Sequence, residues 1–118
     1  MTPEGRVKKL VTSYLDQLKD EGFPLYYSMF VPVGYGKRNT LDYTLCLAGH
    51  FVAIETKAPG EDLRPTQRIT CRDMLTSGAT VFIVSGAEGL DAFKRWVERH
   101  ADWIANIGRH RRNESVVP

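Results

Sequence analysis

The sequence has little cysteine, no long apolar run and no strong excess of one charge. Only two of its 118 residues are cysteines, Cys46 and Cys71, and they form no CxxC motif. This excludes a disulfide scaffold and a cysteine-based zinc site. Its longest apolar runs, such as residues 81–84, are far shorter than the roughly 20 residues that span a membrane. The N-terminus lacks the apolar core of a secretory signal. We therefore expect a cytoplasmic protein with reduced, partly buried thiols.

Positive charge is unevenly distributed, although the net charge is only +2. Three groups of basic residues are noted: Lys37 with Arg38, Arg64 with Arg68 and Arg72, and Arg109 with Arg111 and Arg112. The four-residue spacing of the second group places it on one helical face. Such clusters suit a polyanionic partner. On charge alone, a solvated surface is an equally good interpretation.

Periodicity in the sequence predicts seven elements. Apolar residues at three- and four-residue steps predict helices over residues 3–21, from 65 to about 77, and from 90 onward with a break near 100–102. Strand patterns cover residues 25–33, 40–47, 51–57 and 80–85, and the last is apolar enough for a strand buried on both faces. The order αβββαβα predicts an α/β fold, a mixed sheet flanked by helices. We expect one domain over residues 1–108 and a flexible basic tail over 109–118.

Two acids and a lysine are expected to meet on one face of a β-hairpin. The second and third predicted strands are joined through Gly49, which favours a tight turn. If Thr44 pairs with Glu55, then Asp42 falls opposite Lys57, and all three charges leave the same face. Charges half-buried on a sheet need compensation. A divalent cation such as Mg²⁺ would supply it, because Mg²⁺ is commonly held by one or two carboxylates. The alternative is a surface cluster of weak salt bridges.

The order of these residues resembles that of a nuclease family. Residues 41–43 and the run Phe51-Val52-Ala53-Ile54-Glu55-Thr56-Lys57 are similar to the core of the PD-(D/E)xK nuclease superfamily. A Glu-x-Lys strand, a short Gly-containing loop and then Gln67 at the start of a helix resemble the VRR-NUC branch in particular. The resemblance extends from Glu4 to about Val84, and its fold is a restriction-endonuclease-like mixed sheet. The usual proline before the first acid is absent, since Leu41 precedes Asp42.

The resemblance implies a role for each matching residue. Asp42 and Glu55 correspond to the metal-binding acids, and the main-chain carbonyl of Thr56 to a further metal ligand. Lys57 corresponds to the catalytic lysine and Gln67 to the active-site glutamine. Glu4 corresponds to an acid of the first helix, which we expect to reach a second metal or its waters. The implied cofactor is Mg²⁺, with Mn²⁺ as a substitute.

Other residues are assigned more ordinary places. His50, in the hairpin turn, and His100 are expected at the surface, and Cys46 is expected as a small packing residue. One residue of the pair Tyr26 and Tyr27 should belong to the core. Trp96 and Trp103, seven residues apart, are expected in the core or at a dimer interface. Tyr35, beside Lys37 and Arg38, is a candidate for stacking on bases.

The function that these features favour is a metal-dependent DNA endonuclease selective for branched DNA, such as four-way junctions. Stand-alone relatives of this kind are often phage-encoded and dimeric. The apolar face of the third helix and the aromatic first strand offer surfaces for a homodimer. Two alternatives stay open: a nucleic-acid-binding module that does not cut, and an α/β interaction domain with an incidental motif.

Overall fold

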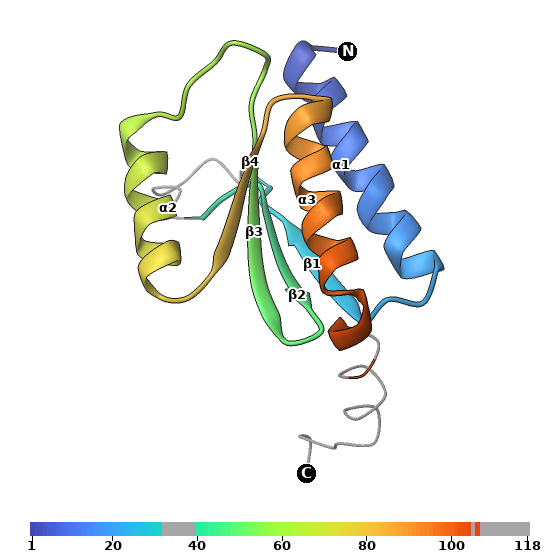
Figure 1. The fold of residues 1–118 in the computed structure, drawn as a ribbon. Helices are drawn as coiled ribbons and strands as arrows, with labels where there is room; N and C mark the ends of the chain where they lie inside the picture. The colour runs from blue at the N-terminus through green and yellow to red at the C-terminus, as the bar shows by residue number, and fades with distance from the viewer. Residues whose placement is uncertain (32–39, 105, 107–118) are drawn as a thin grey trace.

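The computed structural model describes residues 1–31, 40–104 and 106, and within them the chain forms the seven predicted elements (Figure 1). They are α1 (Pro3–Asp20), β1 (Leu25–Met29), β2 (Tyr43–Leu47), β3 (His50–Thr56), α2 (Pro65–Thr76), β4 (Thr80–Val84) and α3 (Ala87–Arg99). This confirms the order αβββαβα. The expected tail over residues 109–118 lies outside the described residues. None of the described helices is both long and apolar enough to cross a membrane.

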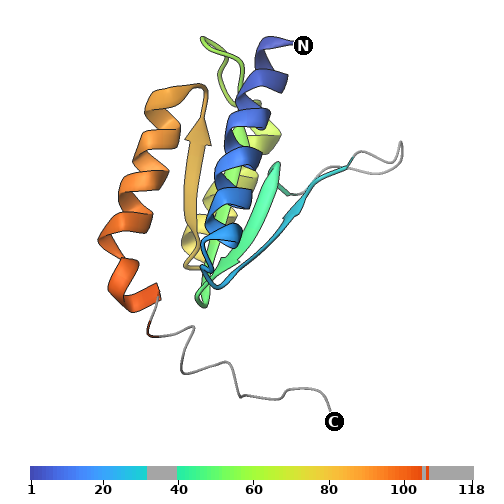
Figure 2. The ribbon, with the colours of Figure 1, turned by 90° about the vertical axis from the view of Figure 1, so that its right-hand side faces the viewer.

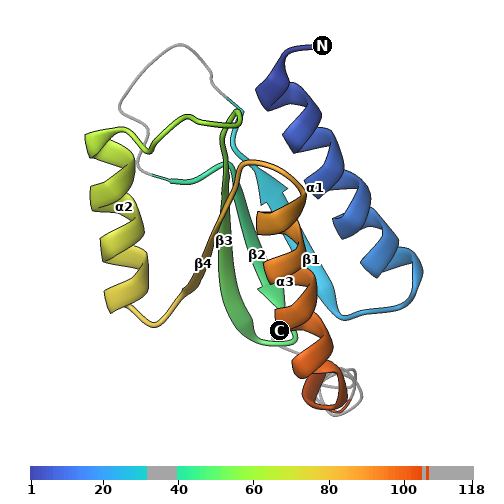
Figure 3. The same ribbon diagram turned by 45° about the horizontal axis from the view of Figure 1, so that its top comes forward.

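The four strands form a single mixed sheet in the order β1-β2-β3-β4. β1 and β2 are antiparallel, as are β2 and β3, whereas β4 runs parallel to β3. Helix α2 covers one face of the sheet and α1 with α3 cover the other (Figures 1 and 3). The prediction that 80–85 is buried on both faces was wrong, because Ile83 is exposed and only Val84 of β4 is fully buried. The apolar sequence of β4 is explained by α2 and α3, which pack against it from the two sides. Most of its residues are nevertheless only partly buried, because β4 is an edge strand of the sheet.

The main core lies between the sheet and the pair α1 and α3, which run side by side over one face (Figure 2). Its buried members are apolar side chains of α1, of the sheet and its hairpin turn, and of α3 and the turn after it: Val7, Val11, Leu15, Leu18, Tyr43, Leu45, Leu47, Ala48, Val52, Ile54, Val84, Leu90, Phe93, Trp96, Val97 and Ile104. The apolar face of α3 is therefore used within this chain. The expectation that this face is spare surface for a dimer was wrong. Tyr27 packs on this core and Tyr26 is exposed, as the alternation predicts.

The hairpin between β2 and β3 is tighter than expected. Leu47 pairs with His50 across a two-residue turn in which Ala48 and Gly49 both have positive φ angles, 51° and 88°. A two-residue turn of this kind needs positive φ at both positions, and alanine rarely supplies it. Thr44 consequently pairs with Ala53, not with Glu55. A shift of two residues preserves the face of every side chain, so the predicted alternation of faces holds.

The end of the sheet at this turn carries an aromatic cluster. The His50 ring lies 4.3 Å from the ring of Trp103 and 5.3 Å from that of Trp96, centroid to centroid. His100 stacks on Trp96 at 4.5 Å and contacts the main-chain oxygen of Trp96. Both histidines were expected at the surface, but the helical turn after α3 brings them together as packing groups.

The second face of the sheet has a smaller core in which Cys71 of α2 packs with Leu41 and Ala53. Burial, and then the negative charge of Glu55, raise the pKa of the Cys71 thiol. Cys46 is exposed, which corrects its expected role as a packing residue.

The two thiols should differ sharply in reactivity. At about pH 8 the native protein should consume one equivalent of a disulfide reagent quickly, at Cys46, and a second only slowly, because the thiolate is the reactive form and access to Cys71 is blocked. Unfolding in denaturant should release both thiols, and Cys46→Ser should remove the fast phase. Fast reaction of both thiols in the native protein would contradict the packing of α2 on the sheet.

Candidate functional site

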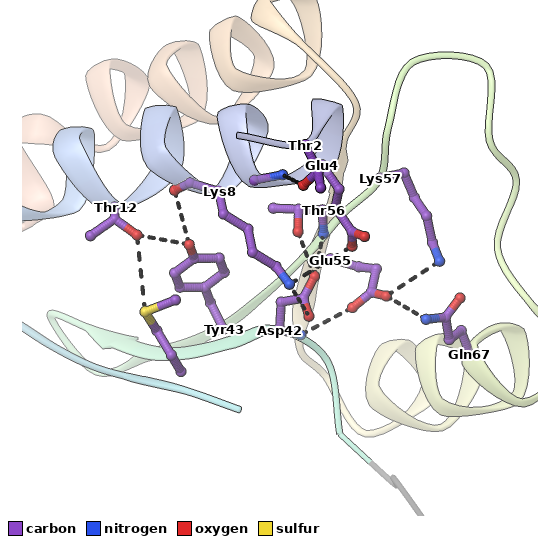
Figure 4. A network of polar contacts seen from close by, with 12 residues as sticks. Thr2, Glu4, Lys8, Thr12, Asp42, Tyr43, Glu55, Thr56, Lys57 and Gln67 are labelled. Carbon is purple, nitrogen blue, oxygen red and sulfur yellow. Dashed lines mark hydrogen bonds and ion pairs between the residues drawn. The ribbon is translucent and has the colours of Figure 1, made fainter. Parts of the chain in front are cut away.

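Two carboxylates meet where β3 ends and β2 begins. Asp42 comes immediately before β2, while Glu55 and Thr56 are the last residues of β3. Because the two strands are antiparallel, the start of one lies beside the end of the other. Asp42 is 5% exposed and Glu55 is fully buried, and the two side chains meet at the end of the sheet, with Lys8 of α1 beside Asp42 and Gln67 of α2 beside Glu55 (Figure 4). The expected convergence of the acids is therefore observed, although the hairpin register places Asp42 nearest Glu55 and not opposite Lys57.

The main chain of each strand fixes the acid of the other. The backbone N–H of Asp42 donates to Glu55 Oε1 at 3.0 Å. In return, the N–H and the hydroxyl of Thr56 donate to Asp42 Oδ2 at 2.9 and 2.6 Å. Hydrogen bonds to a carboxylate oxygen are short and strong. The pair is thus held rigidly.

Lys57 and Gln67 converge on the other oxygen of Glu55. Lys57 is almost fully buried, and its Nζ lies 3.7 Å from Glu55 Oε2. Gln67 Nε2 donates to the same oxygen at 2.6 Å, while Gln67 Oε1 accepts the N–H of Arg64 at the start of α2. That second bond fixes which end of the amide faces Glu55. The first turn of α2 therefore positions a donor on the carboxylate.

Helix α1 contributes one residue that the sequence interpretation missed. Lys8 Nζ lies 3.7 Å from Asp42 Oδ1 and 3.8 Å from Glu4 Oε1 (Figure 4). Glu4, expected beside the acids, is thus connected to Asp42 through Lys8. The signal was available in the sequence, because a residue four positions after Glu4 lies on the same helical face.

The donor set fits a hard divalent cation. Two carboxylates lie side by side, and no group of three or more His, Cys, Asp or Glu side chains able to hold a metal occurs among the described residues. Mg²⁺ keeps several waters and needs only one or two carboxylates, which Asp42 and Glu55 can supply.

Basic side chains lie along the exposed surface of α2, the helix that carries Gln67. Arg64 and Arg68 flank Gln67 at the start of the helix, and Arg72 follows one turn later, all three exposed. The remaining predicted contacts to nucleic acid lie outside the described residues: Tyr35, Lys37, Arg38, Arg109, Arg111 and Arg112.

Comparison with known proteins identifies a shared fold. A solved structure described as "VRR_NUC domain" superposes with a TM-score of 0.64 at 22% sequence identity, and the match covers 85% of this chain and 98% of that one. No protein-family model matches the sequence, and no curated protein does so either. The predicted family resemblance is confirmed at the level of the fold.

Proposed function

We propose that this chain, which has the fold of a VRR-NUC domain, is a metal-dependent endonuclease that hydrolyses phosphodiester bonds of DNA. The observation that carries this proposal is the buried pair Asp42 and Glu55 with Lys57 against it. Two buried carboxylates and a buried ammonium contribute little to stability, because the cost of burying charge offsets most of their attraction. Their arrangement is better explained by binding and chemistry.

The metal ligands would be one oxygen from each carboxylate and the main-chain carbonyl of Thr56. The cation would be Mg²⁺, for which Mn²⁺ would substitute. Glu4 would act from the edge of the site, on waters of that ion or on a second one. When bound, the ion would polarise the scissile phosphate and lower the pKa of a coordinated water.

Two further residues would contribute to the reaction, Lys57 by acting on the water and the phosphate and Gln67 by positioning Glu55. Lys57, held beside Glu55, would orient the attacking water or take its proton, and would stabilise the negative charge that develops on the phosphate. Gln67 would keep the Glu55 carboxylate in place through its 2.6 Å hydrogen bond.

DNA would be held through its backbone by exposed basic residues, with Tyr35 stacking on a base. The proposed phosphate contacts are Lys37, Arg38, Arg64, Arg68, Arg109, Arg111 and Arg112. Contacts of this kind position the duplex without reading its sequence. Selectivity would then come from the shape of the DNA, which is why we propose branched substrates such as four-way junctions.

A homodimer would supply the two symmetric cuts that resolving a junction requires. One chain offers one site, whereas a pair related by a two-fold axis presents two. The support that remains for a dimer is β1, an edge strand with Tyr26 exposed, because open edges are usually covered. We propose that the protein acts in the cytoplasm, which is that of the host cell if the protein is phage-encoded.

A panel of labelled duplex, nicked, flap and four-way-junction DNA would test the proposal. With Mg²⁺ we expect cleavage, greatest on the junction and made as paired cuts, and with a chelator we expect none. Binding without cleavage in either Mg²⁺ or Mn²⁺ would favour a module that does not cut. Absence of both binding and cleavage would overturn the proposal in favour of a protein interaction domain.

A further inference from the structure

Lys8 is the second lysine of the site, and it differs from Lys57 in exposure. Each carboxylate has an ammonium 3.7 Å away, Lys57 on Glu55 and Lys8 on Asp42. The Lys57 side chain is 6% exposed, whereas that of Lys8 is 38% exposed, at the rim of the site. Lys57 is therefore enclosed in its place, and Lys8 has space to leave.

The position of Lys8 is set by the residue next to Asp42. The Tyr43 hydroxyl, on a buried ring, donates to the main-chain oxygen of Lys8 at 3.1 Å and lies 2.8 Å from the hydroxyl of Thr12. This pins the first turns of α1 to the start of β2 (Figure 4). The lysine side chain consequently starts from a fixed point above Asp42, and only its flexible stem moves.

A cation bound at Asp42 would repel Lys8 at its present distance. Both would be attracted to the same carboxylate, and two positive charges a few ångströms apart in a partly buried site repel strongly. Lys8 has a second partner to retreat to, because Glu4 Oε1 already lies 3.8 Å from its Nζ. An α1 pair four residues apart is a stable resting place for the lysine.

We infer that Lys8 is an exchangeable counter-ion: it neutralises Asp42 while no divalent cation is bound and is displaced toward Glu4 when one binds. The inference rests on the proposed function, since it requires a cation at Asp42. Lys8 thus competes with the metal. Its presence stabilises the metal-free protein and weakens metal binding.

Lys8→Met tests the exchange, with Lys9→Met as the matched control. Both variants remove one positive charge from neighbouring positions of α1, and Lys9 is exposed. In a calorimetric Mn²⁺ titration without DNA, Lys8→Met should bind about three- to fivefold more tightly than Lys9→Met, the size expected for losing a half-exposed competing ion pair. Without metal, Lys8→Met should have a lower melting temperature than the parent, and saturating Mn²⁺ should reduce the difference between the two melting temperatures.

The outcomes separate this inference from the proposed function. If the parent binds Mn²⁺ and Lys8→Met binds it no more tightly than Lys9→Met, the exchange is wrong and the nuclease proposal stands. If the parent binds no Mn²⁺, both are overturned. Should Lys8→Met fold poorly, Lys8→Gln keeps a polar side chain at the rim and carries the same expectation.

Discussion

Asp42→Asn should reduce Mg²⁺-dependent DNA cleavage by about 10³-fold or more. A catalytic metal stabilises the developing charge by several kcal/mol, and each loss of about 1.4 kcal/mol is tenfold in rate. The variant should still fold, because an asparagine oxygen can accept both hydrogen bonds that Thr56 donates to Asp42 Oδ2. DNA affinity should be unchanged or higher, since a negative charge that repels phosphate has been removed. Single-turnover cleavage and a binding titration measure the two effects separately.

Asp62→Asn is the matched control, because Asp62 is an exposed acid in the loop before α2. This variant removes one negative charge that does not belong to the pair Asp42 and Glu55, and it should cleave DNA as the parent does.

Glu55→Gln should be as inactive as Asp42→Asn but also less stable, because Glu55 accepts from both the Asp42 N–H and Gln67 Nε2. A glutamine cannot accept at both ends, and one buried donor left without a partner costs about 1–3 kcal/mol. Cleavage by Asp42→Asn at the parental rate would show that Asp42 is not part of the catalytic site.

Lys57→Met should lower turnover by about 10²- to 10⁴-fold, the usual contribution of a positioned proton-transfer group. Methionine fills much of the buried volume of the lysine stem but carries no charge. Mn²⁺ affinity should be kept or raised, because the ammonium 3.7 Å from Glu55 Oε2 no longer opposes the cation. Cleavage kinetics together with a Mn²⁺ titration distinguish this outcome from the loss of a metal ligand.

The split between metal binding and turnover decides what Lys57 does. If Lys57→Met loses metal affinity and cleavage together, the lysine is a structural support of the acids. If the variant cuts DNA as fast as the parent, it has no part in the reaction. The Asp42→Asn variant, measured in the same way, should lose both Mn²⁺ affinity and cleavage, whereas Lys57→Met should lose cleavage alone.

Much of the fold was predictable because its signals are local. Apolar residues at helical spacing defined α1 from Pro3, and alternation defined which side chains of β2 and β3 face the core. The convergence of Asp42 and Glu55 followed from that alternation, since any register shift by an even number of residues leaves both acids on one face.

The features that were missed depend on tertiary structure or on an unusual conformation. The hairpin register differs from the predicted one because Ala48 adopts a positive φ of 51°. An alanine in the sequence gives no indication of this conformation. The edge position of β4 and the burial of the α3 face reflect how elements stack, which periodicity alone does not specify. Lys8 reaches Asp42 because α1 packs on the sheet through the main core and through the 3.1 Å hydrogen bond from Tyr43 to the main chain of Lys8.

Anomalous scattering from crystals grown with Mn²⁺ tests the central claim most directly. A peak should lie between the carboxylates of Asp42 and Glu55, within coordination distance of both, and it should vanish in crystals of Asp42→Asn. Crystals of the parent protein that show no peak between these two acids at saturating Mn²⁺, or a peak bound elsewhere, would contradict the assignment of this pair as the metal site.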